Sequence, residues 1–407
     1  MPPPESLPPA QPAFILRGHS AQIHALHFTQ NNARLLTGDA EGWLISWNLA
    51  FKRPVATWKA HDNAILGLGS WGADKVITHG RDHKLIVWKL PYAAEEQMDN
   101  VLPVNATDLV KQPWILHVLP VNTLNFCSFA MCLDGMPPPQ GVGKTIQDTN
   151  ITQSILLAVP SAVDSGGIDI YQLPSESHAA VITADRNTTT GMVMALSILA
   201  ETSQIQVAAG YESGHTMVFV QNDPSAAFQR LYCAQTHSQP ILSLSISPSN
   251  DHYFTSAADA IIAKHPFPSA QSIWKTDLKP LKVIQTKHSG QQGLQARSDG
   301  RLFATAGWDA RIRVYAAKSM KEVAVLKWHK AGCYATAFAT VEQHAPLTGL
   351  QTPDELEDDH TATIVDTNLD QSLPSTTVQE RRDNKAQTTH WLAAGSKDGK
   401  VSLWDIY

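Results

Sequence analysis

A repeated pattern, in which a tight polar turn is followed by a strand that ends in a ring-bearing residue, constrains this chain more than any other feature. The clearest copies are LLTGDAEGWLISWN, VITHGRDHKLIVWK, FATAGWDARIRVYA and LAAGSKDGKVSLWD; weaker ones are AVDSGGIDIYQ, AAGYESGHTMVFV and TSAADAIIAKHPF. Their closing rings are Trp47, Trp88, Tyr171, Phe219, His265, Tyr315 and Trp404. Strands of period-two alternation separated by turns, repeated along a chain, predict an array of similar small sheets.

The spacing of the seven rings predicts how many sheets there are. The intervals are 41, 83, 48, 46, 50 and 89 residues, and a four-stranded propeller blade takes about 40–50 residues. The two long intervals indicate insertions, which we place at 91–113, 132–150 and 341–387 because strand alternation is poor there. We therefore expect an all-β fold, a single seven-bladed β-propeller over residues 13–407.

The two ends of the chain predict how the ring closes. The sequence stops at VSLWDIY, after the third strand of the last repeat, whereas AFILRG near the start has no blade of its own. Pairing of FILR with the strand of Trp404 would remove two open sheet edges. The Pro-rich residues 1–12 are expected to be disordered.

A buried polar relay is expected to order the turns of the best repeats. Each relay would join a histidine at the start of the repeat, a Ser or Thr, the Asp of the turn and the closing ring. We assign one to His61, Thr78, Asp82 and Trp88, and a second to His288, Thr305, Asp309 and Tyr315. His19, His237 and His329 open three further repeats. Glu41 at the Asp position, Ala394 at the Thr position and His265 as a closing ring predict weaker order in their blades.

Composition excludes several classes of function. The formal net charge of -6 and the pI near 6.3 give no basic footprint for nucleic acid or for an anionic membrane. The four cysteines lack CxxC spacing, and MPPPESLPPAQPAF is not a signal peptide, so we expect an intracellular protein. We expect no direct binding to nucleic acid or membrane.

Local motifs for catalysis or cofactors fail on inspection. The string GVGKT at 141–145 resembles a phosphate loop, but Pro138 stands where the pattern requires glycine. The histidines are explained by turn ordering rather than by metal binding, and no GxSxG elbow is present. We therefore expect no catalytic residue, cofactor, metal or small-molecule substrate, and hence no enzyme.

The turns of the upper rim, between the second and third strands, are the candidate recognition sites. The residues expected to project there are Ala40, Arg81, Asp164, Glu212, Ala258, Trp308 and Lys397. Trp308 is the outstanding one, since aromatic side chains anchor many interfaces; the alternative is that its ring folds back onto a neighbouring blade. Trp308, Arg81, Lys397 and Glu212 are the candidate partner-binding residues.

The longest insertion, 341–387, is strongly acidic. It contains ten Asp or Glu residues against Arg381, Arg382 and Lys385. Such acidity is typical of a solvated loop, with a site for a basic partner as the alternative. The segment is predicted to be removable without loss of folding.

Several blocks of sequence carry a family resemblance. PAFILRGHSAQIHALHF, RLLTGDAEGWLISWNL, KRPVATWKAHDNAILGL, KVITHGRDHKLIVWKL and VAAGYESGHTMVF together resemble the fungal ASTRA-associated protein 1 family of WD-repeat proteins. The resemblance implies a non-catalytic scaffold subunit of the nuclear ASTRA complex. It also implies links to chromatin remodelling and to the co-chaperones that mature phosphatidylinositol-3-kinase-related kinases. A G-protein-β-like signalling adaptor is the alternative; it is disfavoured because such proteins carry an N-terminal helix that this Pro-rich start cannot form.

Overall fold

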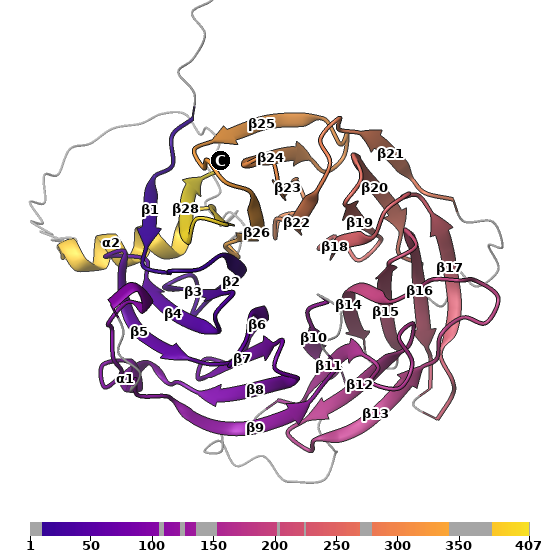
Figure 1. Ribbon diagram of the computed structural model, residues 1–407, viewed down its shortest axis with the longest axis horizontal. Helices are drawn as coiled ribbons and strands as arrows, with labels where there is room; N and C mark the ends of the chain where they lie inside the picture. Colours follow the sequence, from indigo (N-terminus) through magenta and orange to yellow (C-terminus); the bar gives the residue numbers. More distant parts are fainter. Residues whose placement is uncertain are drawn as a thin grey trace, which may run out of the picture.

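The chain forms a closed ring of seven sheets around a central channel (Figure 1). The computed structural model describes residues 10–105, 110–122, 127–135, 153–201, 204–223, 225–268, 279–341 and 377–406. Residues 1–9 of the Pro-rich start, the GVGKT string and residues 342–376 of the acidic insertion lie outside this description. The all-β, seven-bladed prediction is confirmed.

Each blade is a four-stranded antiparallel sheet, ordered from the channel outward. Blade 1 is β2 (Ile23–Thr29), β3 (Arg34–Asp39), β4 (Trp43–Asn48) and β5 (Arg53–Lys59). Blade 2 is β6 (Ile65–Trp71), β7 (Lys75–Gly80), β8 (Lys84–Lys89) and β9 (Trp114–Pro120). Blade 3 is β10 (Ala130–Leu133), β11 (Ile155–Pro160), β12 (Ile168–Leu173) and β13 (Ser177–Ile182). Blade 4 is β14 (Val193–Glu201), β15 (Gln204–Tyr211), β16 (His215–Gln221) and β17 (Gln229–Gln235).

The second half of the ring repeats the same order. Blade 5 is β18 (Ile241–Ile246), β19 (His252–Ala257), β20 (Ile261–Pro266) and β21 (Lys282–Gln285). Blade 6 is β22 (Gln291–Ala296), β23 (Leu302–Gly307), β24 (Arg311–Ala316) and β25 (Glu322–Lys327). Blade 7 is β26 (Cys333–Phe338), β27 (Trp391–Ser396), β28 (Lys400–Asp405) and the N-terminal β1 (Phe14–Arg17). All seven closing rings lie on third strands, which is why their spacing counts the blades.

Side-chain burial explains why the strands differ in pattern. Inner strands such as β6 alternate between buried and half-buried residues, because one side faces the channel. Second strands such as β3 are buried throughout, since neighbouring blades cover both faces. Among the described residues, the buried apolar side chains form seven clusters, one at each junction between adjacent blades. The core is therefore a ring of interfaces rather than one central mass.

The ends of the chain close the ring as the sequence predicts. Phe14 pairs with Leu403 and Arg17 with Lys400 in an antiparallel ladder between β1 and β28. Leu16 is buried in the cluster that joins blades 7 and 1. Figure 1 shows β1 lying beside β28, so the last blade is built from both ends of the chain.

The first insertion carries structure that the sequence did not reveal. It contains α1 (Tyr92–Glu95) and the 3-10 turn η1 (Pro103–Asn105). Glu95 of α1 forms a buried ion pair with Arg34 of blade 1, with 2.7 Å between Oε2 and Nε. Further along the insertion, the Asp99 carbonyl accepts a hydrogen bond from the backbone NH of Thr57, which lies on the outer strand of blade 1. Residues 92–105, which we call the strap, thus extend from blade 2 across blade 1.

The far end of the same strap reaches the closing junction. Leu102 packs against the cluster between blades 7 and 1. A side chain at Gly18, directly after β1, would collide with the Leu102 side chain. The Leu102 side chain would have to shift if residue 18 carried a Cβ atom.

The acidic insertion ends in a helix that belongs to the folded core. α2 (Val378–Thr388) begins with a capping box between Thr377 and Glu380. Its Ala386 is buried, and the Ala386 carbonyl accepts a hydrogen bond from the Trp391 indole at 3.0 Å. Asn32 of blade 1 donates to the carbonyls of both Thr340 and Gln387, so it ties the two ends of the insertion together. The sequence pattern did not show this helix. Its contacts argue against removal of all of 341–387 without loss of folding, which stays a prediction.

Candidate protein-interaction face

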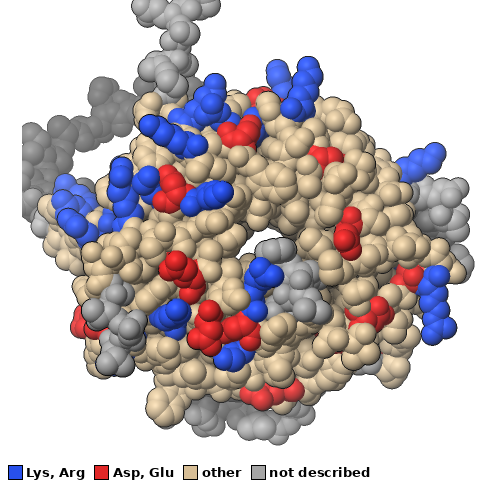
Figure 2. Space-filling view, in the orientation of Figure 1, with Lys and Arg blue, Asp and Glu red and all other residues tan. Residues whose placement is uncertain are grey.

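The upper rim, which carries the turns between second and third strands, is built the same way in six blades. The backbone NH of the residue after each second strand donates to a carbonyl just before the inner strand of the same blade. These residues are Ala40, Arg81, Glu212, Ala258, Trp308 and Lys397. In blade 3 the turn is longer, and Asp164 instead accepts from the backbone NH groups of Gly166 and Ala184. Figure 2 shows this rim, with the channel at its centre.

The relay predicted for blade 2 is present as a chain of short contacts. The Trp88 indole donates to Thr78 Oγ1 at 2.9 Å, and Thr78 Oγ1 lies 2.7 Å from His61 Nε2. With Nδ1 protonated, His61 then donates to Asp82 at 2.9 Å. Burial, the largest single effect, raises the pKa of Asp82, but the hydrogen bond and charge of His61, the backbone NH of Asp62 and the charge of Lys84 together outweigh it and the pKa is lowered.

Blade 1 has an equally complete relay, which corrects the assignment of Glu41. His19 donates to Asp39 at 2.8 Å, and the Trp47 indole reaches His19 through Thr37. Asp39 also accepts from the backbone NH groups of Glu41 and Trp43. Glu41 itself is exposed and contacts only the Ser20 hydroxyl among side chains. The acid of this turn comes two residues earlier than counting back from Trp47 predicts.

Blade 5 keeps the relay although its closing ring is a histidine. His265 Nε2 lies 2.9 Å from Thr255 Oγ1, where the tryptophan NH of other blades stands. Thr255 leads to His237 and Asp259 at 2.8 and 3.1 Å. The second nitrogen of His265 bonds the Tyr232 hydroxyl at 2.9 Å, so both ring nitrogens are used. Burial lowers the pKa of His265 to about 3, and the ring is neutral. These contacts argue against the weaker order predicted for this blade from His265.

Blade 7 replaces its missing threonine from a neighbouring strand. Ala394 occupies the expected threonine position, but Ser402 of β28 bonds both the Trp404 indole and His329 Nε2 at 2.8 Å. The last link is loose, because His329 Nδ1 lies 3.8 Å from Asp398.

The second predicted relay, in blade 6, is wrong in its histidine. The His288 side chain is 44% exposed and lies 3.7 Å from Asp309. Fully buried Gln291 takes its place and accepts from the Thr305 hydroxyl at 2.6 Å. Asp309 is held by the Arg313 guanidinium at 3.1 and 2.6 Å. Tyr315 is buried in the junction between blades 5 and 6. The relay is replaced because Arg313 supplies a positive partner that the sequence reading did not consider.

Trp308 combines the two predicted alternatives: its ring packs against its own blade and remains partly exposed. One side of its ring covers Gly290, where any Cβ atom would collide with it, and its indole NH donates to Gln292 at 2.7 Å. The residue nevertheless stays 47% exposed. Lys397 and Glu212 are also exposed, whereas Arg81 is half-buried. These four residues lie on four blades: Trp308 and Lys397 are on the neighbouring blades 6 and 7, whereas Arg81 and Glu212 are on blades 2 and 4.

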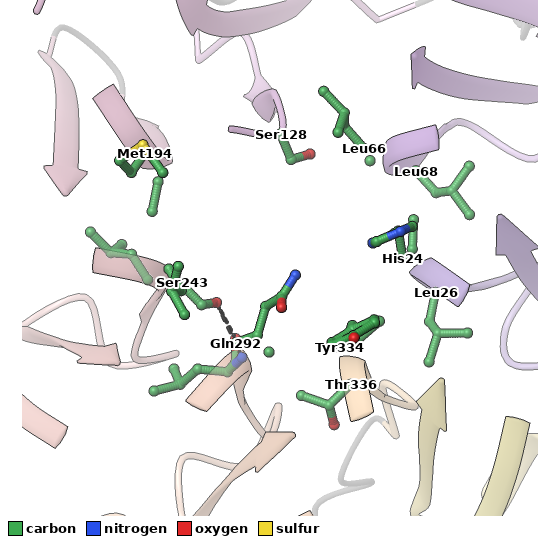
Figure 3. A pocket seen from close by; sticks show the side chains of 18 of the residues that line it. His24, Leu26, Leu66, Leu68, Ser128, Met194, Ser243, Gln292, Tyr334 and Thr336 are labelled. Carbon is green, nitrogen blue, oxygen red and sulfur yellow. Dashed lines mark hydrogen bonds between the residues drawn. The ribbon is translucent and has the colours of Figure 1, made fainter. Parts of the chain in front are cut away.

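The central channel is lined by both apolar and polar side chains of the inner strands. Figure 3 shows Leu66, Met194, Gln292, Tyr334 and His24 around it, which come from the inner strands of blades 2, 4, 6, 7 and 1. The rings of His24 and Tyr334 are stacked, with centroids 5.6 Å apart. The cavity has a volume of about 260 Å³, and leucines, Ser128, Ser243 and Thr336 also line it.

The described residues hold little that resembles an active site. Within those ranges there is no group of three or more His, Cys, Asp or Glu residues placed to hold a metal ion. The four cysteines are free thiols, and burial raises the pKa of Cys132 and of Cys333 to about 12. No helix in the described part of the chain is long and apolar enough to cross a membrane.

Comparison with known proteins places the chain in a family. The family profile described as ASTRA-associated protein 1 matches residues 12–404. A protein of that name from Penicillium rubens is 46% identical, with 98% of each chain covered. One from Verticillium alfalfae is 47% identical over 97% of this chain and 93% of its own, and one from Schizosaccharomyces pombe is 30% identical over 80% and 93%. The resemblance seen in the sequence blocks is confirmed: this chain belongs to the ASTRA-associated protein 1 family.

Proposed function

We propose that this protein is a non-catalytic scaffold subunit of the nuclear ASTRA complex. The observation that carries the proposal is membership of a family whose members are named for association with ASTRA. The fold supports the scaffold role, because a closed propeller presents turns from several blades on one rim without large conformational change.

The relays support the absence of catalysis in the proposal. The relays of Thr37, Thr78 and Thr255 place a hydroxyl, an imidazole and a carboxylate in a row, as in many hydrolases. Each of these threonines is fully buried. Their hydroxyls bond to a closing ring and cannot meet a substrate. These groups order the turns of the rim.

The finer part of the proposal concerns the partners. As a subunit of that complex, the protein would be linked to chromatin remodelling and to the co-chaperones that mature phosphatidylinositol-3-kinase-related kinases. A test is purification of a tagged copy, expressed at native level in the cells that make it, followed by mass spectrometry. We expect the other ASTRA subunits and the kinase-maturation co-chaperones to be enriched over a tag-only control, and fluorescence of the tagged copy in the nucleus.

Two results would contradict the proposal. Recovery of none of those proteins would remove the assignment to the complex. Recovery of a G-protein γ-like subunit and membrane signalling proteins would instead favour the G-protein-β-like adaptor.

A further inference from the structure

An exposed, positively charged surface covers the upper rim of blades 6 and 7. It consists of the exposed Arg17, Lys327, Lys330 and Lys397 and the half-buried Arg311, together with Trp308; we call it the blade 6–7 basic surface. Figure 2 shows Lys and Arg side chains gathered on the upper left of this face, over β1, β28 and β25 of Figure 1.

Contacts between backbone segments show that these residues form one surface. Trp308 and Arg311 share the turn between β23 and β24, and Arg311 stands directly opposite Lys327 in the sheet. A Cβ atom on Gly332, two residues after Lys330, would lie 3.3 Å from the Trp308 Cα atom. The Gly332 carbonyl accepts from the Lys397 backbone NH at 2.8 Å. Arg17 completes the surface, with its guanidinium 6.0 Å from the Trp328 ring centroid.

The acids nearest to this surface are engaged by other cations. Asp309 is engaged by Arg313 at 2.6 Å, and Asp398 by Lys400 at 2.9 Å. Within the described ranges, none of the five surface cations forms an ion pair with Asp or Glu. Like charges directly opposite each other, as at Arg311 and Lys327, disfavour folding. A bound anion would relieve this repulsion.

Trp308 supplies an apolar centre to the charged surroundings. Its NH is already satisfied by Gln292, so the exposed part of the ring offers apolar area rather than a donor. An aromatic residue at the centre with charged residues around it is the arrangement of protein interfaces. Nucleic acid would require cations along an extended track, and the whole chain is negative.

We propose that the blade 6–7 basic surface binds an acidic peptide segment of a partner protein, with Trp308 packing against an aliphatic or aromatic residue of that segment. The proposal rests on the scaffold role and names the chemistry of one partner. Carboxylates of the segment would pair with Lys327, Lys330 and Lys397, and the affinity would fall steeply with salt.

The direct test is fluorescence anisotropy of the purified full chain with a labelled 12-residue peptide of Asp and Glu around a central Leu-Phe pair. The test variant is the triple substitution K327E/K330E/K397E. The control K59E/K84E/K89E makes the same charge change on blades 1 and 2. W308A is matched by F51A, since Phe51 is an aromatic residue of similar exposure on blade 1. Equal thermal midpoints would show that the variants fold.

We expect the triple variant and W308A each to weaken binding at least tenfold, and both controls to stay within twofold of the unaltered chain. Equal losses in the test and control triples would overturn the proposal by showing nonspecific charge attraction. Tighter binding of a 20-nucleotide poly-dT, lost in the same triple variant, would also overturn it in favour of nucleic acid. Absence of peptide binding to the unaltered chain at low salt would have the same effect.

A second arm separates this proposal from the proposed function. The triple variant and its control are tagged and purified from cells as above. If the unaltered chain recovers ASTRA subunits and the test variant recovers them equally, the docking surface is wrong while the function stands. If the unaltered chain recovers none, the proposed function fails whatever the peptide does.

Discussion

Replacing Asp39 by alanine should destabilise the protein strongly, whereas replacing Glu41 should not. Asp39 is fully buried and accepts three hydrogen bonds, from His19 Nδ1 and from the backbone NH groups of Glu41 and Trp43. Each donor left without an acceptor in a buried site costs about 1–3 kcal/mol. Since such losses are not fully additive, we expect a loss of about 3–5 kcal/mol in the free energy of unfolding.

Asparagine at position 39 divides the effect. Both backbone NH groups donate to Asp39 Oδ1, which Asn keeps, whereas His19 donates to Oδ2, which becomes an NH2 group. Asp39→Asn should therefore cost less than Asp39→Ala, about 1–3 kcal/mol. Glu41→Ala removes only an exposed contact to Ser20 and should cost under about 0.5 kcal/mol.

Urea denaturation followed by tryptophan fluorescence measures these differences, because Trp47 is itself part of the relay. The three variants are compared at equal slope of the free energy against urea concentration. A Glu41→Ala loss as large as that of Asp39→Ala would refute the reasoning and restore Glu41 as the acid of the turn.

Three further predictions concern the strap, the buried histidines and the acidic insertion. Glu95→Ala leaves Arg34 buried without its partner and should cost about 3–5 kcal/mol in urea, while the exposed neighbour Glu96→Ala should cost under about 0.5 kcal/mol. Burial lowers the pKa of His27 to about 4, so only the unfolded chain takes up this proton as the pH falls from about 6.5. The free energy of unfolding should therefore decline from pH 6.5 towards pH 4. In urea titrations at several pH values, His27→Gln should make this decline shallower by up to about 1.4 kcal/mol per pH unit. An unchanged slope would contradict the prediction. Replacing 342–376 by a Gly-Ser linker of about 12 residues should leave the thermal midpoint unchanged, whereas removing 342–387 should lower it by exposing the site of Ala386; equal midpoints would show that α2 contributes nothing.

The number of blades and the closure were predictable because both depend on short stretches of sequence. Each repeat carries its own turn and closing ring within about 40–50 residues. In the sequence, FILR is a strand without a blade of its own and VSLW ends a blade that lacks a fourth strand, and the two pair in the structure. A fixed spacing from the closing ring predicted the wrong acid in blade 1, where the turn contains both Asp39 and Glu41. Asp39 lies eight residues before Trp47, whereas Asp82 lies six before Trp88. Each carboxylate nevertheless bonds the Nδ1 atom of the histidine that opens its own repeat.

Contacts between distant segments were not predictable from pattern. Arg34 and Glu95 are 61 positions apart and pair only because the strap crosses from blade 2 to blade 1. Gln291 replaces His288 from within the inner strand, and Ser402 replaces Ala394 from a neighbouring strand. Each substitution preserves the hydrogen bond while moving the residue that makes it, so a search for fixed residue types misses it.

Blades 6 and 7, which carry the basic surface, depart from the full relay of blades 1, 2 and 5. Blades 1, 2 and 5 have complete relays that end on a buried or nearly buried Asp. In blade 6 the acid is turned towards Arg313 and His288 is released to solvent, and in blade 7 the His329–Asp398 contact opens to 3.8 Å. Departures from local rules that keep the fold intact are expected where surface function is under constraint. Blades 3 and 4 open without a histidine and also lack the full relay among the described residues. Departure from the relay therefore accompanies the basic surface without locating it, and the assignment of the docking site rests on the cations beside Trp308.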